Sequence, residues 1–221
     1  MIEIHDLALD APDARRLFAG LDLVVPRGGN QLVTGPSGSG KSRLLKVVAG
    51  TEQPARGRVS VGGVAVWPGS GAFALMGKVR VGFAFATGGL LSNLSLWDNV
   101  ALPLRFSGVP AEALQGRVDG ALERLGLAAV AGLRPHAVSA SARKHGNLAR
   151  VLAYDPDLIL LDDPIEGLDR SDRDVALGLI QEWALDPAKT LLMAQEQPDP
   201  FAQLASGQLD LQALSVPLET P

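Results

Sequence analysis

Apolar and polar positions follow different periods in different parts of the chain, and this pattern predicts strands that alternate with helices. Residues 2–9 alternate apolar and polar side chains, as in a strand that is buried on one face. Residues 158–161 form a continuous apolar run, which is typical of a strand buried on both faces of a parallel sheet, and residues 190–194 predict another buried strand. Residues 79–85 also predict a buried strand, and residues 86–150 are mainly helical in pattern. The order of these elements predicts an α/β fold with a mainly parallel sheet.

A glycine-rich stretch lies between a predicted strand and a predicted helix. It consists of Gly35, Pro36, Ser37, Gly38, Ser39, Gly40, Lys41 and Ser42, and it fits the pattern G-x-x-x-x-G-K-[ST] at every fixed position. The glycines let backbone N–H groups wrap a phosphate at the positive end of the following helix. In this pattern Lys41 reaches the β- and γ-phosphates, and the Ser42 hydroxyl ligates Mg²⁺. The alternative is a flexible Gly/Ser loop, which the flanking strand and helix disfavour.

Two carboxylates follow a buried strand in the second half of the chain. Asp162 and Asp163 come directly after the apolar run of residues 158–161. The carboxyl ends of central strands line the crevice in which an α/β sheet binds its ligand. We therefore expect both carboxylates to lie in the ligand site of the sheet.

Composition narrows the classes of function. A net charge of −4 and a pI near 5.4 argue against a surface that binds nucleic acid. The chain has no cysteine, so neither a disulfide nor a thiolate metal site is expected. Its first residues lack the pattern of a signal peptide, and its most apolar window, residues 59–77, is interrupted by glycine and proline. We expect any membrane association to come through a partner.

The order of these motifs resembles that of the ATP-binding subunits of ABC transporters, over nearly the whole chain. A helical segment opened by residues 138–143 lies between Lys41 and Asp162, and a strand ending near Gln195 follows. The resemblance implies binding of ATP and Mg²⁺ in a P-loop NTPase fold of the ABC ATPase type. In that family Asp162 would hold Mg²⁺ through water, Asp163 would be the general base, and Gln195 would occupy the position of the switch histidine.

The resemblance also implies a head-to-tail dimer. Residues 138–142 would be the signature motif, in which Ser139 donates to the γ-phosphate bound by the other subunit. Asp169 would be the D-loop aspartate that crosses the dimer interface. The sequence leaves open whether the second ATP-binding subunit is an identical chain or a different one.

Several positions depart from the family pattern, and they gather around the γ-phosphate and the base. Ala86 stands in place of the Q-loop glutamine, and residues 140–142 read Ala-Ser-Ala where the family has Gly-Gly-Gln. Asp163 replaces a glutamate and retracts the carboxylate by one methylene, whereas a base must lie within about 2.6–3.2 Å of its water or one water removed. Gln195 can donate a hydrogen bond but cannot carry charge. No aromatic side chain stands near residues 10–12 to stack on adenine, and Phe18, the nearest, is expected in the core.

Residues 87–104 resemble the region after the Q-loop in the ATPases of the mammalian-cell-entry (Mla-like) lipid transporters. The resemblance implies that this region, with the helices after it, grips the coupling helix of an integral membrane permease. Trp97 and Leu96 are expected to contribute to that contact. We therefore expect residues 1–221 to form one ATP-binding domain, with an antiparallel N-terminal part and a helical subdomain near residues 87–152. The subunit would lie peripherally on the cytoplasmic face of the inner (plasma) membrane.

The leading hypothesis is an ATP-binding subunit of a membrane transporter for lipid or other hydrophobic cargo, with weak hydrolysis. The alternative is a regulatory or structural nucleotide-binding module that does not power transport. A third class, a different P-loop enzyme, is disfavoured because the Asn-Lys-x-Asp base reader of GTPases is absent. The three histidines have no metal-ligand spacing, and residues 143–145 are interpreted as a solvated helix face.

Overall fold

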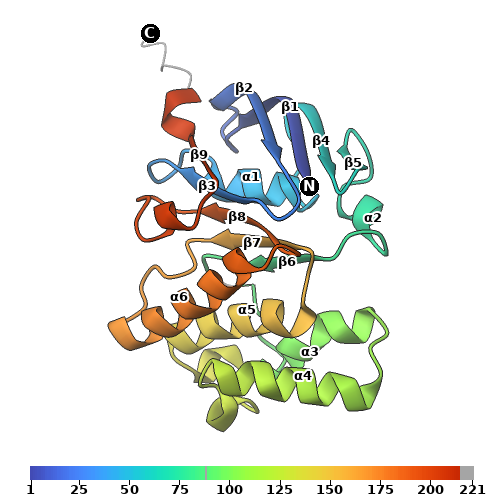
Figure 1. Cartoon of the computed structure of the whole chain (residues 1–221), viewed down its shortest axis with the longest axis vertical. Coiled ribbons are helices and arrows are strands. Elements are labelled where there is room, and N and C mark those ends of the chain that lie inside the picture. The colour runs from blue at the N-terminus through green and yellow to red at the C-terminus, as the bar shows by residue number, and fades with distance from the viewer. Residues whose placement is uncertain (88, 215–221) are drawn as a thin grey trace.

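A computed structural model describes residues 1–87 and 89–214 of the chain, and it contains two β-sheets and a layer of helices (Figure 1). The first sheet is antiparallel, with the order β2-β1-β4-β5. Its strands are β1 (Ile2–Asp10), β2 (Arg16–Val25), β4 (Arg56–Val61) and β5 (Val64–Trp67). The second sheet is parallel, with the order β6-β7-β8-β3-β9. Its strands are β3 (Asn30–Thr34), β6 (Val81–Ala84), β7 (Leu158–Asp162), β8 (Thr190–Ala194) and β9 (Gly207–Asp210).

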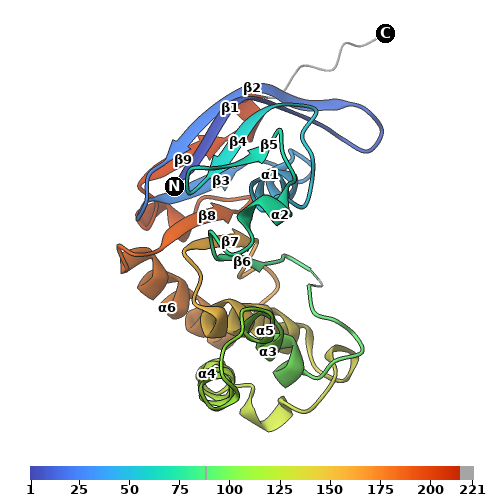
Figure 2. The ribbon, with the colours of Figure 1, turned by 90° about the vertical axis from the view of Figure 1, so that its right-hand side faces the viewer.

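The helices cover both faces of the parallel sheet. They are α1 (Lys41–Val48), α2 (Ala72–Leu75), α3 (Leu96–Phe106), α4 (Ala111–Arg124), α5 (Ala140–Tyr154) and α6 (Arg170–Leu185). Four short 3₁₀ helices span Ala128–Val130, Pro135–Ala137, Phe201–Gln203 and Leu211–Leu214. Helix α1 lies between the two sheets, whereas α3 to α6 lie on the opposite side of the parallel sheet, and Figure 2 shows the same stacking from the side. The predicted α/β fold with a mainly parallel sheet, an antiparallel N-terminal part and a helical region is confirmed.

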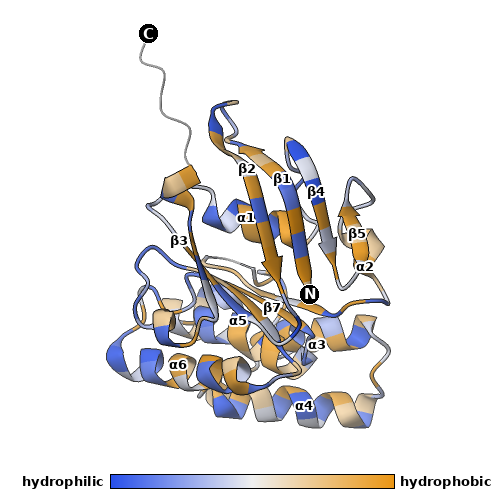
Figure 3. Cartoon of the chain, turned by 45° about the horizontal axis from the view of Figure 1, so that its top comes forward, coloured by the Kyte–Doolittle hydropathy of each residue, from blue (hydrophilic) through white to orange (hydrophobic). Residues whose placement is uncertain are grey.

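The central strands are buried on both faces because alternate residues enter two different cores. In β7, Ile159 and Leu161 pack into the core under the helical layer, whereas Leu158 and Leu160 pack into the core around α1. All four are completely buried, which explains the continuous apolar run in the sequence. The colouring by hydropathy shows β7 as apolar, while the outer helices carry polar residues (Figure 3).

The structure corrects one local prediction and adds one strand. The run Ser171-Asp172-Arg173-Asp174 resembles a capping box and predicts a cap at Ser171. The first turn of α6 is instead capped by Asp169, whose side chain accepts from the backbone N–H of Asp172. The segment after Gln197, which gave no readable pattern, contains β9, and this strand pairs with β3. Four residues are too few for a hydrophobic period to be recognised.

Candidate nucleotide site

The glycine-rich loop follows β3 and leads directly into α1, as predicted. Gly35, Gly38 and Gly40 all have positive φ, at 144°, 79° and 102°. A Cβ at Gly35 would lie 2.8 Å from the hydroxyl oxygen of Ser39, and a Cβ at Gly40 would lie 3.1 Å from the ring of Phe18. These two positions therefore require glycine because of both their conformation and their neighbours. Phe18 is completely buried, which confirms that it belongs to the core.

The Lys41 side chain turns back into this loop. It is only 6% exposed, and its Nζ donates to the carbonyl oxygens of Gly35 at 2.7 Å and Pro36 at 3.1 Å. The hydroxyl of Ser39 is buried and has no hydrogen-bond partner among the residues that the structure describes. A cation and an unpartnered hydroxyl inside a cradle of backbone N–H groups fit the phosphates of a nucleotide.

The hydroxyl of Ser42 donates to the Asp162 carboxylate at 2.8 Å. Ser42 is in the first turn of α1 and Asp162 is the last residue of β7, so the fold joins two halves of the sequence at this bond. Burial raises the pKa of Asp162, and the bond from Ser42 acts in the opposite direction. The described part of the chain holds no cluster of three or more His, Cys, Asp or Glu able to bind a metal. One hydroxyl and one carboxylate are still sufficient for Mg²⁺, which takes its other ligands from phosphates and water.

Asp163 lies directly beyond the strand in a left-handed conformation, with φ of 42°. Its backbone N–H donates to the carbonyl oxygen of Ala194 at the end of β8. Its half-buried carboxylate has a raised pKa, first because of burial and then because of the neighbouring charge of Asp162. The positive charge of Lys41 acts in the opposite direction and lowers this pKa.

Gln195 follows β8, next to β3 in the sheet. Its backbone N–H donates to Val33, and its side-chain Nε2 donates to the carbonyl oxygen of Asp199 at 3.0 Å. Its Oε1 is buried and accepts no hydrogen bond from the described residues. The fold therefore brings Lys41, Ser42, Asp162, Asp163 and Gln195 to one edge of the parallel sheet.

Ala86 contributes to the same edge through its backbone. Its N–H bonds to the Asp162 carboxylate, although its side chain has no polar atom. The loop that Ala86 begins was expected to include Gly88, which lies outside the described residues. Sequence reasoning missed Arg150 as the anchor of this loop: its guanidinium bonds to the carbonyl oxygens of Phe83 and Gly89 and to the side chain of Asn147. The sequence pointed to Arg150 only through the run Leu-Ala-Arg at residues 148–150, which continues the helix after the signature position.

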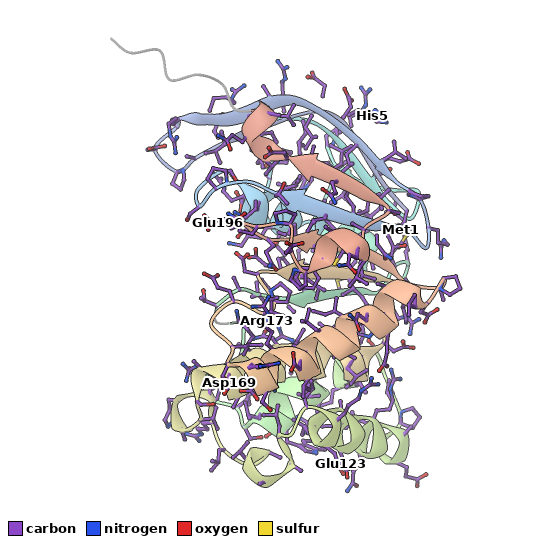
Figure 4. The ribbon with its side chains drawn as sticks, turned by 60° about the vertical axis from the view of Figure 1, so that its left-hand side comes forward. Met1, His5, Glu123, Asp169, Arg173 and Glu196 are labelled. Carbon is purple, nitrogen blue, oxygen red and sulfur yellow. The ribbon has the colours of Figure 1, made fainter. Side chains whose placement is uncertain are left out.

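Ser139 and Asp169 lie at the N-terminal ends of α5 and α6. The Ser139 hydroxyl accepts from the N–H of Ala142 at 3.0 Å and so caps α5. Asp169 caps α6 in the same way, and Figure 4 shows it at the start of that helix, on the same side as Glu196. Both residues are exposed, and in the described part of the chain their side-chain oxygens accept bonds only from their own helices. The structure of one chain does not bring them to the phosphate loop.

The predicted solvated face at residues 143–145 is wrong, because none of its three members is exposed. His145 is 3% exposed, with its ring nitrogens 3.1 Å from the carbonyl oxygens of Leu125 and Asp172. Lys144 is half-buried, and it bonds to the loop after β7. The reason is that α5 packs against α3, α4, α6 and β6, so few of its sides meet solvent.

The apolar segment after the Q-loop position also differs from expectation. Leu96 is completely buried, so it belongs to the core and not to a docking surface. Trp97 is partly buried, and its indole N–H donates to Asp119 at 2.7 Å. Leu91, within the segment, is 48% exposed, whereas Met76 before it and Phe106 after it are 69% and 85% exposed.

Met76 and Phe106 line a groove of about 910 Å³ between the sheet region and the helical layer. Its walls include residues of β6, the end of α3 and the second half of α5, with Phe83, Phe85 and Arg150 among them. No helix within the described residues is both long enough and apolar enough to span a bilayer.

Comparison with known proteins agrees with this architecture. A methionine import ATP-binding protein of Paraburkholderia xenovorans is 36% identical over 169 residues, which is 76% of this chain and 44% of that protein. The intermembrane phospholipid transport ATP-binding protein MlaF of Haemophilus influenzae is 34% identical over 182 residues, or 82% of this chain and 69% of that protein. The chain thus spans between about half and two thirds of the length of these curated relatives.

Solved structures show the same fold. The dimeric ATP-binding cassette MJ0796, solved in a post-hydrolysis state with ADP and phosphate, superposes with a TM-score of 0.86. The alignment covers 95% of this chain and 94% of that one, at 22% identity. The sequence model of the ABC transporter family matches residues 18–166, which is well over half of the chain. The chain therefore belongs to the ABC transporter family, as the order of its motifs indicated.

Proposed function

We propose that the chain binds Mg²⁺-ATP in the phosphate loop and acts as the ATP-binding subunit of a membrane transporter. The observation that supports this most directly is the 2.8 Å bond between Ser42 and Asp162, beside a loop into which Lys41 is turned. Bound ATP would supply the phosphoryl group and Mg²⁺ the neutralising charge. Lys41 would exchange its carbonyl partners for phosphate oxygens, while Ser42 and Asp162 hold the metal.

Titration of the purified chain with ATP, with and without Mg²⁺, tests this proposal. Binding that requires the metal is expected, because the Asp162 carboxylate would otherwise lie near the phosphate charges without a cation between them. Ser42→Ala is expected to weaken the dependence on Mg²⁺, since it removes a ligand without altering the loop glycines. Absence of nucleotide binding by the folded chain would refute the proposal.

We propose further that hydrolysis is slow. Asp163 is the candidate base, and its raised pKa favours proton acceptance. Its side chain is nevertheless one methylene shorter than the family's glutamate, and Ala86 offers no side-chain group to orient water. The side-chain oxygen of Gln195 is buried without a partner among the described residues, and the amide carries no charge. Weak turnover by the isolated chain is the expected result.

The groove supports docking to a permease. It is bordered by exposed apolar side chains and by both the sheet region and the helical layer, the part of the domain that includes residues 87–152. We propose that a helix of an integral membrane partner occupies it, which would hold the chain peripherally at the cytoplasmic face of the inner membrane.

Similarity to a phospholipid transport ATP-binding protein favours lipid or other hydrophobic cargo. A dimer, of two identical or two different chains, would complete the site with Ser139 and Asp169.

Charged substitutions in the groove test the docking proposal. The double variant Met76→Asp, Phe106→Asp is expected to release the chain from native membranes without unfolding it, because both side chains are already exposed. Leu185→Asp is the matched control, since Leu185 is 80% exposed on α6, outside the groove. A wild-type chain that is wholly soluble and without a partner in a fractionated extract would contradict the proposal. Leu96→Asp is unsuitable because Leu96 is a core residue.

The alternative function is a regulatory or structural module that binds ATP without driving transport. Ala86 and Gln195, at positions that normally serve hydrolysis, are the observations that favour it. Measurement of turnover after reconstitution with the copurified permease separates the two functions. If a different ATP-binding subunit copurifies, mixing the two chains shows whether Ser139 of this chain restores the activity of the partner.

A further inference from the structure

Lys144 connects the helical layer directly to the loop that carries Asp163. It lies in α5, and its Nζ donates to the carbonyl oxygen of Asp163 at 2.8 Å and to that of Glu166 at 2.6 Å. One ammonium group therefore holds both ends of a tight turn that follows β7. Bonds from a charged donor are stronger than those between neutral groups.

The turn has little support of its own. Its internal bonds, from the N–H of Glu166 to Asp163 and from the N–H of Leu168 to Ile165, are both 3.3 Å long. Asp163 has a φ of 42°, a conformation that non-glycine residues adopt at a cost. A loop with weak internal bonds and an unfavourable backbone conformation depends on contacts from outside.

The surroundings of Lys144 agree with such a role. A cavity of about 410 Å³ lies between the loop, the start of α5 and the segment that begins at Ala86, and Lys144 forms part of its wall. The small side chain of Ala86 leaves this space open. Burial lowers the pKa of Lys144, whereas the charges of Glu166, Asp163 and Asp162 raise it and so favour the ammonium form.

The same helix reaches the docking groove. Arg150, Val151 and Tyr154, in the second half of α5, line the groove, while Lys144 lies in the first half. A continuous helix moves as one body, so a displacement at the groove is carried to Lys144 and from there to the turn.

We propose that Lys144 is a positioning residue that holds Asp163 in place and transmits movements of α5 to it. The inference rests on the proposed function, because it assumes that Asp163 acts on bound ATP. Ala86 has no polar side-chain group that could link the parallel sheet to the helical layer. The Lys144 ammonium links the helical layer to the loop after β7 without such a group at position 86.

Three variants of the full chain test this role. Lys144→Met removes the donors but keeps an unbranched side chain, and Lys144→Arg restores donors. Lys189→Met is the matched control, because Lys189 also donates to a backbone carbonyl, that of Pro156, but at the opposite edge of the sheet. Hydrogen exchange of residues 163–168 is measured without nucleotide, and the turnover number and affinity for Mg²⁺-ATP are measured separately.

In Lys144→Met we expect exchange of residues 163–168 to accelerate about tenfold. The turnover number should fall about tenfold while the affinity for Mg²⁺-ATP stays within about twofold. Lys144→Arg should recover most of both effects, and Lys189→Met should show neither at these residues. Unchanged exchange or unchanged turnover in Lys144→Met would overturn the inference. If the wild-type chain has no turnover, the proposed function fails, and exchange alone then decides whether Lys144 holds the loop.

Discussion

The phosphate-binding half of the site comes from one continuous stretch of chain, whereas the half expected to carry hydrolysis is assembled from three separate loops. In the first half, Lys41 bonds to carbonyl groups of its own loop, and the glycines set the backbone without outside help. In the second, Ala86, Asp163 and Gln195 follow β6, β7 and β8, and each is held by residues distant in sequence. A local motif keeps its geometry whenever its own sequence is kept. A composite site changes when any of its supports changes.

This difference predicts that binding and hydrolysis can be separated by substitution. The largest expected effect is on turnover. Asp163→Asn removes the candidate base and should lower residual turnover by about 100-fold or more, since a general base typically contributes 10²–10⁴-fold. Single-turnover kinetics with saturating Mg²⁺-ATP measures this, and Glu196→Gln serves as a control next to the site. Brisk turnover by the wild-type chain would show instead that the composite half is fully competent.

The next largest effect concerns the local half. Lys41→Ala removes a charge-assisted contact to phosphate and should weaken nucleotide binding by about 1.5–3 kcal/mol. That is roughly a ten- to 150-fold rise in Kd. Calorimetric titration measures it, with Lys78→Ala as a control that removes an exposed lysine charge elsewhere. Equal affinity in wild type and Lys41→Ala would mean that the phosphates bind somewhere else.

A smaller effect is expected when the base is lengthened. Asp163→Glu restores the missing methylene, yet turnover should rise less than about tenfold, because groups that act as one unit have non-additive effects. The triple change Ala86→Gln, Asp163→Glu, Gln195→His should exceed the product of the three single effects. Full recovery by Asp163→Glu alone would show that Ala86 and Gln195 are neutral replacements.

The smallest effect is on stability as a function of pH. The pKa values of Asp162 and Asp163 are raised by burial, so between the ordinary carboxyl pKa near 4 and the raised value the folded chain binds more protons than the unfolded chain. Stability without nucleotide should therefore fall as pH rises through this interval. Asp163→Asn should remove part of that fall and stabilise the chain at neutral pH by less than about 1 kcal/mol, given solvent screening. Urea unfolding at several pH values measures both, and a stability that rises with pH would contradict the assignment.

The sequence predicted the local half well because its information is local. The spacing of the motif placed Lys41 and Ser42, and the apolar run before Asp162 placed that carboxylate at the end of a buried strand. These features depend on residues within a few positions of one another.

The features that were missed or wrong depend on packing between distant elements. No period in the sequence shows that Leu96 is buried or that Met76 and Phe106 are exposed beside the groove. Lys144 and His145 were expected in solvent, because a run of basic residues is usually exposed, but α5 is packed on several sides. The role of Arg150 was missed for the same reason, because its partners Phe83 and Gly89 are distant in sequence and come next to it only when the chain folds.

The position of β3 in the sheet has a consequence for how the chain acquires its structure. Asn30 pairs with Leu191 and Gln31 with Gly207, so both neighbours of β3 come from the far end of the chain. During synthesis the strand that leads into the phosphate loop emerges early and stays unpaired on both edges until β8 and β9 have been made. Long-range pairing of this kind slows folding and leaves open edges exposed meanwhile. The loop that is most local in sequence is therefore among the last parts of the domain to be fixed in place.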